Sequence, residues 1–176
     1  MFALAFWLML AGARPSHPKM PELSRVTAIS ITVNRFDEWL SWRCDHLFKL
    51  EDSVWLCATT IAVDGVPDTV VCTDTVASSL ISTFTSRLET VRPKSRPYNP
   101  TWTHSELLVR KRICLLWAND SIVYDTWSQS KTGKPWQVII GTDTLVSKSS
   151  AIHESLELLK PYFHEKLLDS LVKARR

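Results

Sequence analysis

The sequence predicts one mixed α/β (α+β) domain built around a single small sheet. Of its 176 residues, 45% are hydrophobic, which is enough for a buried core without disulfides or a metal. Some segments space their apolar residues as on one helix face, and others are short β-branched runs. The clearest signal is a hairpin, in which Ile113–Trp117 and Ile122–Tyr124 flank Asn119-Asp120, two residues that tolerate left-handed backbone. The expected order is helix, strands, helix, hairpin, strand and helix.

Residues 1–20 are predicted to be an apolar leader followed by a proline-rich linker. Phe2–Leu10 is apolar, and Ala11-Gly12-Ala13 has the small-x-small form of a signal-peptidase site. No Lys or Arg precedes the apolar run, and the segment is too short to span a bilayer. We therefore expect a helix packed on the domain or a disordered leader, with a secretion signal as the alternative.

The segment Leu23–Phe36 fits two patterns. Its apolar residues step by three and four, as on one face of a helix, and Pro21 suits a first helical turn. In the rival pattern, β-branched residues alternate with Ser30 and Thr32, as in a strand. We favour the helix.

Two strands are expected before the middle of the chain. Trp39–Leu50 is amphipathic and fits either a helix or a strand. Ser53–Val63 has the β-branched and aromatic composition of a strand, and Asp64-Gly65 is a strong turn signal. Thr69–Cys72 is therefore predicted to be the returning strand.

A helix is predicted to follow the second of these strands. Apolar residues from Val76 to Leu88 recur at helical spacing, and Asp74 or Thr75 is suited to cap the helix start. A proline-rich loop is expected at residues 93–104, since the residue before a proline disfavours helix.

The C-terminal part is predicted to contain a turn, a strand and a last helix. Gly141-Thr142-Asp143 forms the turn, and Ser149 or Ser150 caps a helix whose apolar residues run from 152 to 171. Pro161 is expected to kink or split this helix, because it lacks a backbone N–H and clashes with the preceding turn.

Motifs for cofactor or metal chemistry are missing from the sequence. The four glycines are too scattered for a phosphate-binding loop, and the four cysteines include no C-x-x-C pair. The five histidines lack metal-ligand spacing, the adjacent carboxylates point apart, and no G-x-S-x-G motif occurs. We expect a non-catalytic binding or assembly protein with no cofactor and no metal. The cysteines are expected to act as small hydrophobes, although their even count permits two disulfides.

Basic residues are concentrated in one stretch, although the formal net charge is only +3. Seven basic and two acidic residues lie between Arg87 and Arg112, an excess that suits contact with phosphate. The alternative is a solvated loop and helix end. The candidate RNA contacts are Arg92, Lys94, Arg96, Arg110, Lys111 and Arg112.

Several motifs near the hairpin resemble, in the same order, the end of the smallest, non-catalytic subunit of the eukaryotic tRNA-splicing endonuclease. They are Lys111–Leu116, Asn119–Ser121, Ile122–Tyr124 and Gly133–Gln137. Two upstream motifs also match, namely Ser16–Lys19, which would precede an opening helix, and Thr69–Thr73, which would be a central strand. The resemblance therefore also favours a helix at Leu23–Phe36. It implies the C-terminal fold of tRNA endonucleases over residues 21–140, with residues 141–176 as a C-terminal strand and helix extension.

The resemblance implies a structural role rather than catalysis. Catalytic relatives cleave RNA with a Tyr, a His and a Lys, and Lys111 is the only position here that corresponds to one of these three. Such a subunit pairs with a catalytic subunit in a nuclear heterotetramer that positions precursor tRNA. Apolar and aromatic residues near the hairpin are candidates for the partner interface, with ordinary core residues as the alternative. They are Ile122, Tyr124, Trp127, Pro135 and Trp136.

A different class of protein is the second hypothesis. A small secreted or membrane-surface interaction protein, rich in Trp, is compatible with the leader at Met1–Ala13. Asn119-Asp120-Ser121 is formally a glycosylation sequon, which matters only if the chain is secreted.

Overall fold

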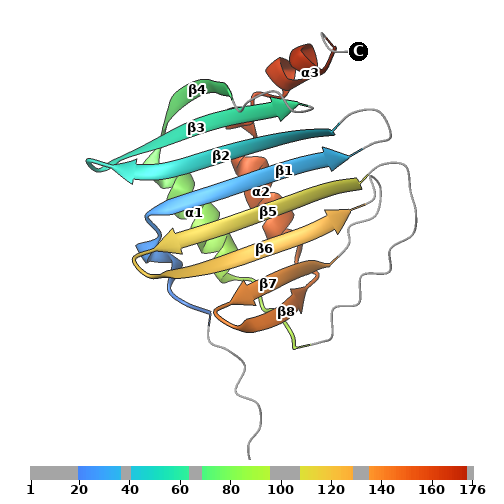
Figure 1. The fold of residues 1–176 in the computed structure, drawn as a ribbon. Coiled ribbons are helices and arrows are strands. Elements are labelled where there is room, and N and C mark those ends of the chain that lie inside the picture. The colour runs from blue at the N-terminus through green and yellow to red at the C-terminus, as the bar shows by residue number, and fades with distance from the viewer. Residues whose placement is uncertain (1–19, 37–40, 64–68, 96–107, 129–134, 174–176) are drawn as a thin grey trace, which may run out of the picture.

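A single antiparallel sheet of eight strands forms the centre of the part of the chain that the structure describes (Figure 1). The computed structural model describes residues 20–36, 41–63, 69–95, 108–128 and 135–173. The strand order is β4-β3-β2-β1-β5-β6-β7-β8, and α1 and α2 lie on one face of the sheet. The predicted mixed α/β class with a C-terminal helix is confirmed, and the sheet is larger than predicted.

The strands and helices have the following bounds. The first four strands are β1 (Ala28–Phe36), β2 (Ser41–Glu51), β3 (Val54–Val63) and β4 (Thr69–Val76). The last four are β5 (Leu108–Trp117), β6 (Asp120–Ser128), β7 (Trp136–Ile140) and β8 (Asp143–Ser147). The helices are α1 (Ser78–Glu89), α2 (Ser150–Leu159) and α3 (Glu165–Lys173), with 3-10 turns η1 (Leu23–Arg25) and η2 (Lys160–Tyr162).

The two halves of the sheet have the same layout. Each consists of four consecutive antiparallel strands followed by a helix, α1 after β4 and α2 after β8. The halves meet where β1 pairs with β5, and Ile31 lies opposite Ile113 at this seam. Because β1 pairs with β2 along its other edge, it is fully hydrogen-bonded at the middle of the sheet.

The helix predicted at Leu23–Phe36 is wrong. Only η1 is helical there, and residues 28–36 form strand β1. The rival alternation was the correct pattern, because Ile29 and Ile31 point to the buried face while Ser30 and Thr32 point away. Pairing with two neighbouring strands outweighs a helical spacing that the same residues satisfy by coincidence. The ambiguous segment 39–50 likewise contains a strand, β2.

The hairpin and the other predicted strands are confirmed. Trp117 pairs with Asp120, so the β5–β6 turn is formed by Ala118 and Asn119, one residue earlier than predicted, and the positive φ is at Ala118. Gly141, with φ of +56°, lies between β7 and β8. A positive φ is unstrained for glycine, which accounts for its use in this tight turn. Residues 54–63 and 69–76 form the antiparallel pair β3–β4.

The helix ends agree only in part with the predictions. Ser149 caps α2, and its Oγ accepts a hydrogen bond of 3.2 Å from the backbone N–H of Ala151. Pro161 splits the last helix into α2, η2 and α3, as expected. The predicted caps of α1, Asp74 and Thr75, are wrong, because both lie within β4 and Ala77 occupies the cap position.

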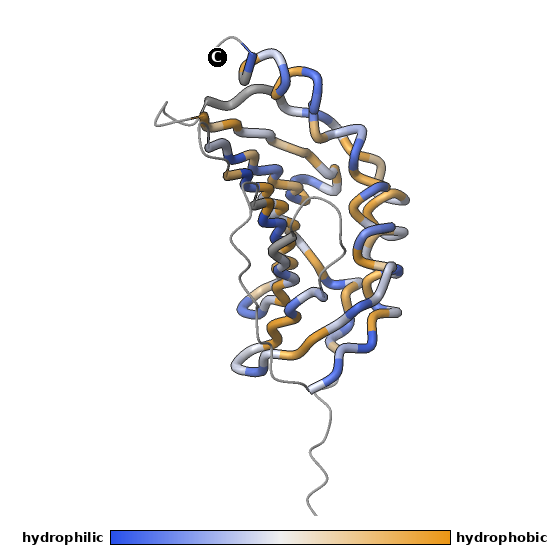
Figure 2. Tube along the Cα trace, turned by 90° about the vertical axis from the view of Figure 1, so that its right-hand side faces the viewer, coloured by the Kyte–Doolittle hydropathy of each residue, from blue (hydrophilic) through white to orange (hydrophobic). Residues whose placement is uncertain are grey.

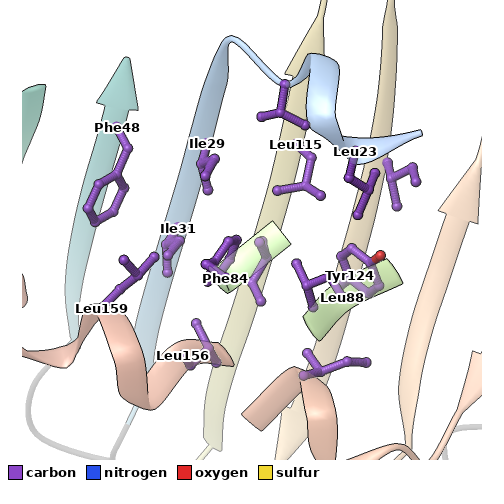
Figure 3. Packing of buried hydrophobic residues seen from close by; sticks show 14 of the residues in the cluster. Leu23, Ile29, Ile31, Phe48, Phe84, Leu88, Leu115, Tyr124, Leu156 and Leu159 are labelled. Carbon is purple, nitrogen blue, oxygen red and sulfur yellow. The ribbon is translucent and has the colours of Figure 1, made fainter. Parts of the chain in front are cut away.

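The core lies between the sheet and the two packed helices α1 and α2. Figure 3 shows Phe84 and Leu88 of α1 and Leu156 and Leu159 of α2 directed towards the strands. Burying each such side chain contributes about 1.5–3 kcal/mol before entropic costs. Fully buried residues of the sheet complete this cluster, among them Ile29, Ile31, Phe48, Leu115 and Tyr124.

The structure does not divide the chain at residue 140. This boundary falls in the β7–β8 hairpin of the common sheet, and α2 supplies Ile152, Leu156 and Leu159 to the same core as the first half. Residues 143–159 are therefore integral to the fold rather than an extension of it. Because α2 covers the sheet next to α1, its removal would expose the centre of the core.

Candidate functional site on the open face of the sheet

The face of the sheet opposite α1 and α2 carries no helix among the described residues (Figure 2). Side chains alternate between the two faces of a strand, so every second residue points to this open face. Several of them are apolar and well exposed, notably Leu47, Val54 and Leu116. The open face is thus a mixed polar and aliphatic surface.

Charged residues from four strands meet on the open face. In one row across the sheet, Thr32 lies opposite both Asp45 and Arg112, and Arg112 lies opposite Asp125. In the next row, Asn34 lies between Arg43 and Arg110. We call the charged members of these rows the arginine–aspartate band. They are Arg43, Asp45, Arg110, Arg112 and Asp125.

Asp125 is the centre of one half of the band. Arg110 binds it through a two-pronged contact, Nε to Oδ1 at 3.1 Å and Nη2 to Oδ2 at 2.6 Å. Arg112 adds contacts from Nε at 3.2 Å and Nη2 at 2.9 Å to Oδ2. The carboxylate is buried, with 4% of the residue exposed. Burial favours a higher pKa for Asp125, but hydrogen bonds from Arg110 and Arg112 more than offset it and lower its pKa.

Asp45 is the centre of the other half. Thr32 Oγ1 donates a hydrogen bond of 2.6 Å to its Oδ1, and Arg43 Nε lies 2.6 Å from its Oδ2. The band therefore contains three arginines and two aspartates, which leaves a formal charge of +1 (3 − 2). Both carboxylates are occupied by cations, so neither is placed to act as a general base.

The arrangement suits binding rather than bond cleavage. Guanidinium groups held in fixed directions present N–H donors to carboxylates and carbonyls. The row of the open face next to the band is less polar, with Leu47, Ser30, Cys114, Val123 and Ile139 on successive strands. A polar cluster beside exposed aliphatic side chains is typical of a protein–protein interface.

The predicted RNA contacts do not form one patch. Arg110 and Arg112 belong to the band and are tied to Asp125, whereas Lys111 points to the opposite face, next to His153 of α2. Burial, and then the charge of Lys111, lowers the pKa of His153.

The remaining basic candidates lie elsewhere. Arg92 bonds to the carbonyls of Glu89 and Val91 at the end of α1, and Lys94 pairs through its backbone with Val146 of β8. Arg96 lies outside the described residues. The structure therefore brings together only two of the six predicted residues.

Most of the predicted interface residues belong to the core. Ile122, Tyr124 and Trp136 are buried on the helix side of the sheet, and Trp136 Nε1 donates a 3.2 Å hydrogen bond to His153 Nε2. These three are therefore core residues, which was the alternative to an interface role, because α1, α2 and the sheet already cover them. Pro135 is half-buried before β7, and the side chain of Trp127 in β6 lies outside the described part.

Sequence reasoning missed Asp45, Asp125 and a buried polar cluster on the other face. The cluster contains Cys44, His46 and Thr59, which hydrogen-bond in series. Cys44 and His46 lie two positions apart, the spacing that places side chains on one face of a strand. That signal was available in the sequence once residues 39–50 were taken as a strand.

Comparison with known proteins does not assign the chain to a family. No protein-family model, curated protein or solved structure matches it. Among the described residues, no three or more His, Cys, Asp or Glu side chains are grouped to hold a metal ion. Within the same residues, no helix has the length and apolar character needed to cross a membrane.

Proposed function

We propose that this chain is a non-catalytic assembly subunit that binds another protein through the open face of its sheet. The observation that carries the proposal is the arginine–aspartate band beside exposed Leu47 and Leu116 on a face that no described helix covers. Specific interfaces combine arginine anchors with apolar contacts, and the open face carries both.

A protein partner fits this face better than RNA. Binding to phosphate backbones depends on several uncompensated cations, whereas the band has a formal charge of only +1. Lys111 points away from the face, which reduces the local positive charge further. A partner surface with a small excess of carboxylates and an apolar centre is complementary to it.

The first partner to test is a catalytic subunit of the tRNA-splicing endonuclease. The support is the resemblance of the hairpin motifs to the smallest subunit of that enzyme. In this chain, the motifs Lys111–Leu116 and Ile122–Tyr124 lie on paired strands. The expected opening helix is a strand, so the support comes from the hairpin and from Thr69–Thr73, which lies in strand β4 before helix α1. In this role the chain acts in the nucleus and contributes geometry, while the partner cuts precursor tRNA.

The experiment is a binding titration between the purified chain and a catalytic endonuclease subunit. We expect binding, a higher melting temperature for the complex, and at least about tenfold weaker affinity when both Arg43 and Arg112 are replaced by alanine. The matched control is Arg25→Ala, which removes an exposed cation outside the sheet. No interaction, or equal affinities for both variants, would refute the proposal.

The second hypothesis, a secreted interaction protein, has one structural observation in its favour. Asn119 of the sequon is exposed at the β5–β6 turn, where a glycan would meet no obstacle from the sheet. Mass spectrometry of the chain from its own cells distinguishes the hypotheses. A glycan on Asn119 and loss of the leader indicate secretion, and an unmodified Asn119 with the leader retained favours the nuclear subunit.

A further inference from the structure

A thiol, an imidazole and a hydroxyl form a connected chain on the helix side of the sheet. Cys44 and His46 project from the same face of β2, and Thr59 of β3 lies directly opposite His46. All three are buried, with 2%, 1% and 0% of the residues exposed. None of them belongs to the arginine–aspartate band, so this cluster and the proposed function can fail independently.

With one tautomer of His46, the hydrogen bonds of the cluster run in a single direction. Thr59 Oγ1 donates to the carbonyl oxygen of Tyr162 at 3.4 Å, because a carbonyl only accepts. The same Oγ1 therefore accepts from the Nδ1–H of His46 at 2.9 Å. This tautomer leaves the Nε2 lone pair of His46 facing Cys44 Sγ at 3.4 Å, so the imidazole accepts a hydrogen bond from the thiol. A base aligned on a thiol is the arrangement that activates cysteine.

Among the described residues, the segment after α2 covers this cluster. The ring of Phe163 stacks on the imidazole of His46, with centroids 4.4 Å apart and planes inclined by 23°. Leu168 of α3 packs beside Cys44 in a small apolar cluster separate from the main core. We call residues 163–173, which comprise Phe163, the junction at His164 and α3, the C-terminal cover.

The C-terminal cover is weakly attached compared with α1 and α2. Leu168 is the one buried residue among the described side chains of α3, while Leu167 and Leu171 are more than a third exposed. At the junction, His164 Nε2 lies 2.8 Å from Asp74 Oδ2, a contact in which both side chains are partly exposed. Figure 1 places α3 near the β4–β3 edge, beyond the layer of α1 and α2. Elements with few buried contacts open at the lowest free-energy cost.

We propose that Cys44 is an oxidation site, which a hydroperoxide modifies when the C-terminal cover is displaced. His46 Nε2 takes the thiol proton, and the thiolate attacks the peroxide oxygen, so an S–O bond forms as the O–O bond breaks. The sulfur loses two electrons and the peroxide gains them. The departing alkoxide, or hydroxide for hydrogen peroxide, takes the proton from His46. The products are a sulfenic acid on Cys44, an alcohol or water, and a neutral imidazole.

The closed cover also keeps the pair unreactive. Burial, and then the charge of His164, lowers the pKa of His46 to about 4, while Asp45 acts in the opposite direction. An imidazole with this pKa is a poor base for a thiol at neutral pH. Displacing Phe163 and Leu168 restores water around the ring, which makes His46 a better base at the moment when Cys44 becomes accessible.

The test is peptide mass spectrometry of the full chain treated with hydrogen peroxide and a reagent that traps sulfenic acids. Cys57, which is fully buried in the main core, is the internal reference for global unfolding. Leu168→Ala removes the buried contact of α3 and is expected to raise Cys44 modification about thirtyfold without changing Cys57. Leu171→Ala, on the exposed side of the same helix, is the matched control and is expected to leave the Cys44 rate unchanged.

Two further variants make the test decisive. Asp74→Asn loosens the junction at His164 without touching the apolar cluster, and is expected to raise Cys44 modification as well. Adding His46→Asn to Leu168→Ala is expected to slow Cys44 modification about tenfold, because the base is lost. The proposal is overturned if Cys44 and Cys57 react in parallel in both opening variants, if Cys44 is never modified, or if the His46 change has no effect.

Discussion

The free energy of unfolding is expected to fall in mild acid, and replacing His46 is expected to reduce this fall. In the folded chain the ring is buried and its pKa lies at about 4, compared with 6.5 for an ordinary histidine. Between these values the unfolded chain binds a proton that the folded chain does not, so the free energy of unfolding falls as the pH falls. The contribution of the neutral His46 ring to the free energy of unfolding amounts to about 3 kcal/mol. It is complete above pH 6.5 and is lost progressively down to about pH 4.

The assay is urea unfolding at a series of pH values from 7.5 to 4.5. His46→Asn keeps a donor for Thr59 while it removes the titrating group, and we expect its unfolding free energy to depend much less on pH than that of the wild type. Ile152→Val in the main core is the control, because a lost apolar contact away from His46 lowers stability by a similar amount at every pH. An acid-dependent loss that is the same in His46→Asn and wild type would refute this interpretation of the buried ring.

Three further predictions concern the core and the band. Asp125→Asn is expected to cost about 3 kcal/mol at pH 7, because Arg110 and Arg112 lose their shared carboxylate, and chemical denaturation measures this. Since the pKa of Asp125 is lowered in the fold, this contribution is present above its ordinary value of 3.8 and disappears as the pH falls through the folded value, so the difference between variant and wild type shrinks in strong acid. Tyr124→Phe is expected to be neutral or to stabilise by up to about 1 kcal/mol in thermal melts, because the buried hydroxyl has no hydrogen-bond partner among the described residues. Truncation after Ser147 is expected to abolish cooperative unfolding followed by circular dichroism, because α2 supplies three buried residues to the core. A cooperative melt of the truncated chain would contradict the placement of α2.

Local signals in the sequence predicted the elements that depend on local geometry. The β5–β6 turn, the Gly141 turn and the Ser149 cap each depend on a few neighbouring residues. The last two were placed correctly, and the β5–β6 turn was placed one residue too late. Strand β1 was predicted wrongly, because the apolar residues of Leu23–Phe36 fit the spacing of a helix as well as that of a strand. The strands that pair with β1 decide between the two structures. Those partners lie up to about ninety residues away along the chain, beyond the range of any local pattern.

The candidate site was only partly accessible to sequence reasoning. Arg110 and Arg112 were singled out by charge, but their role depends on Asp125, which the register of the β5–β6 hairpin places opposite Arg112. The contact of Thr32 with Asp45 depends on a strand that was predicted as a helix. A correct register for both hairpins is thus what separates a list of basic residues from the band observed in the structure.

The measurement that tests the central claim most directly is methyl NMR of the chain as the catalytic endonuclease subunit is added. Methyl groups of Leu47, Val54 and Leu116 report on the open face, and those of Ile31 and Leu156 report on the helix side. We expect shifts or broadening confined at first to the open-face methyls, and the loss of these changes when Arg43 and Arg112 are both replaced by alanine. Perturbation of the helix side alone, or unperturbed methyls at saturating partner, would contradict binding through the open face of the sheet.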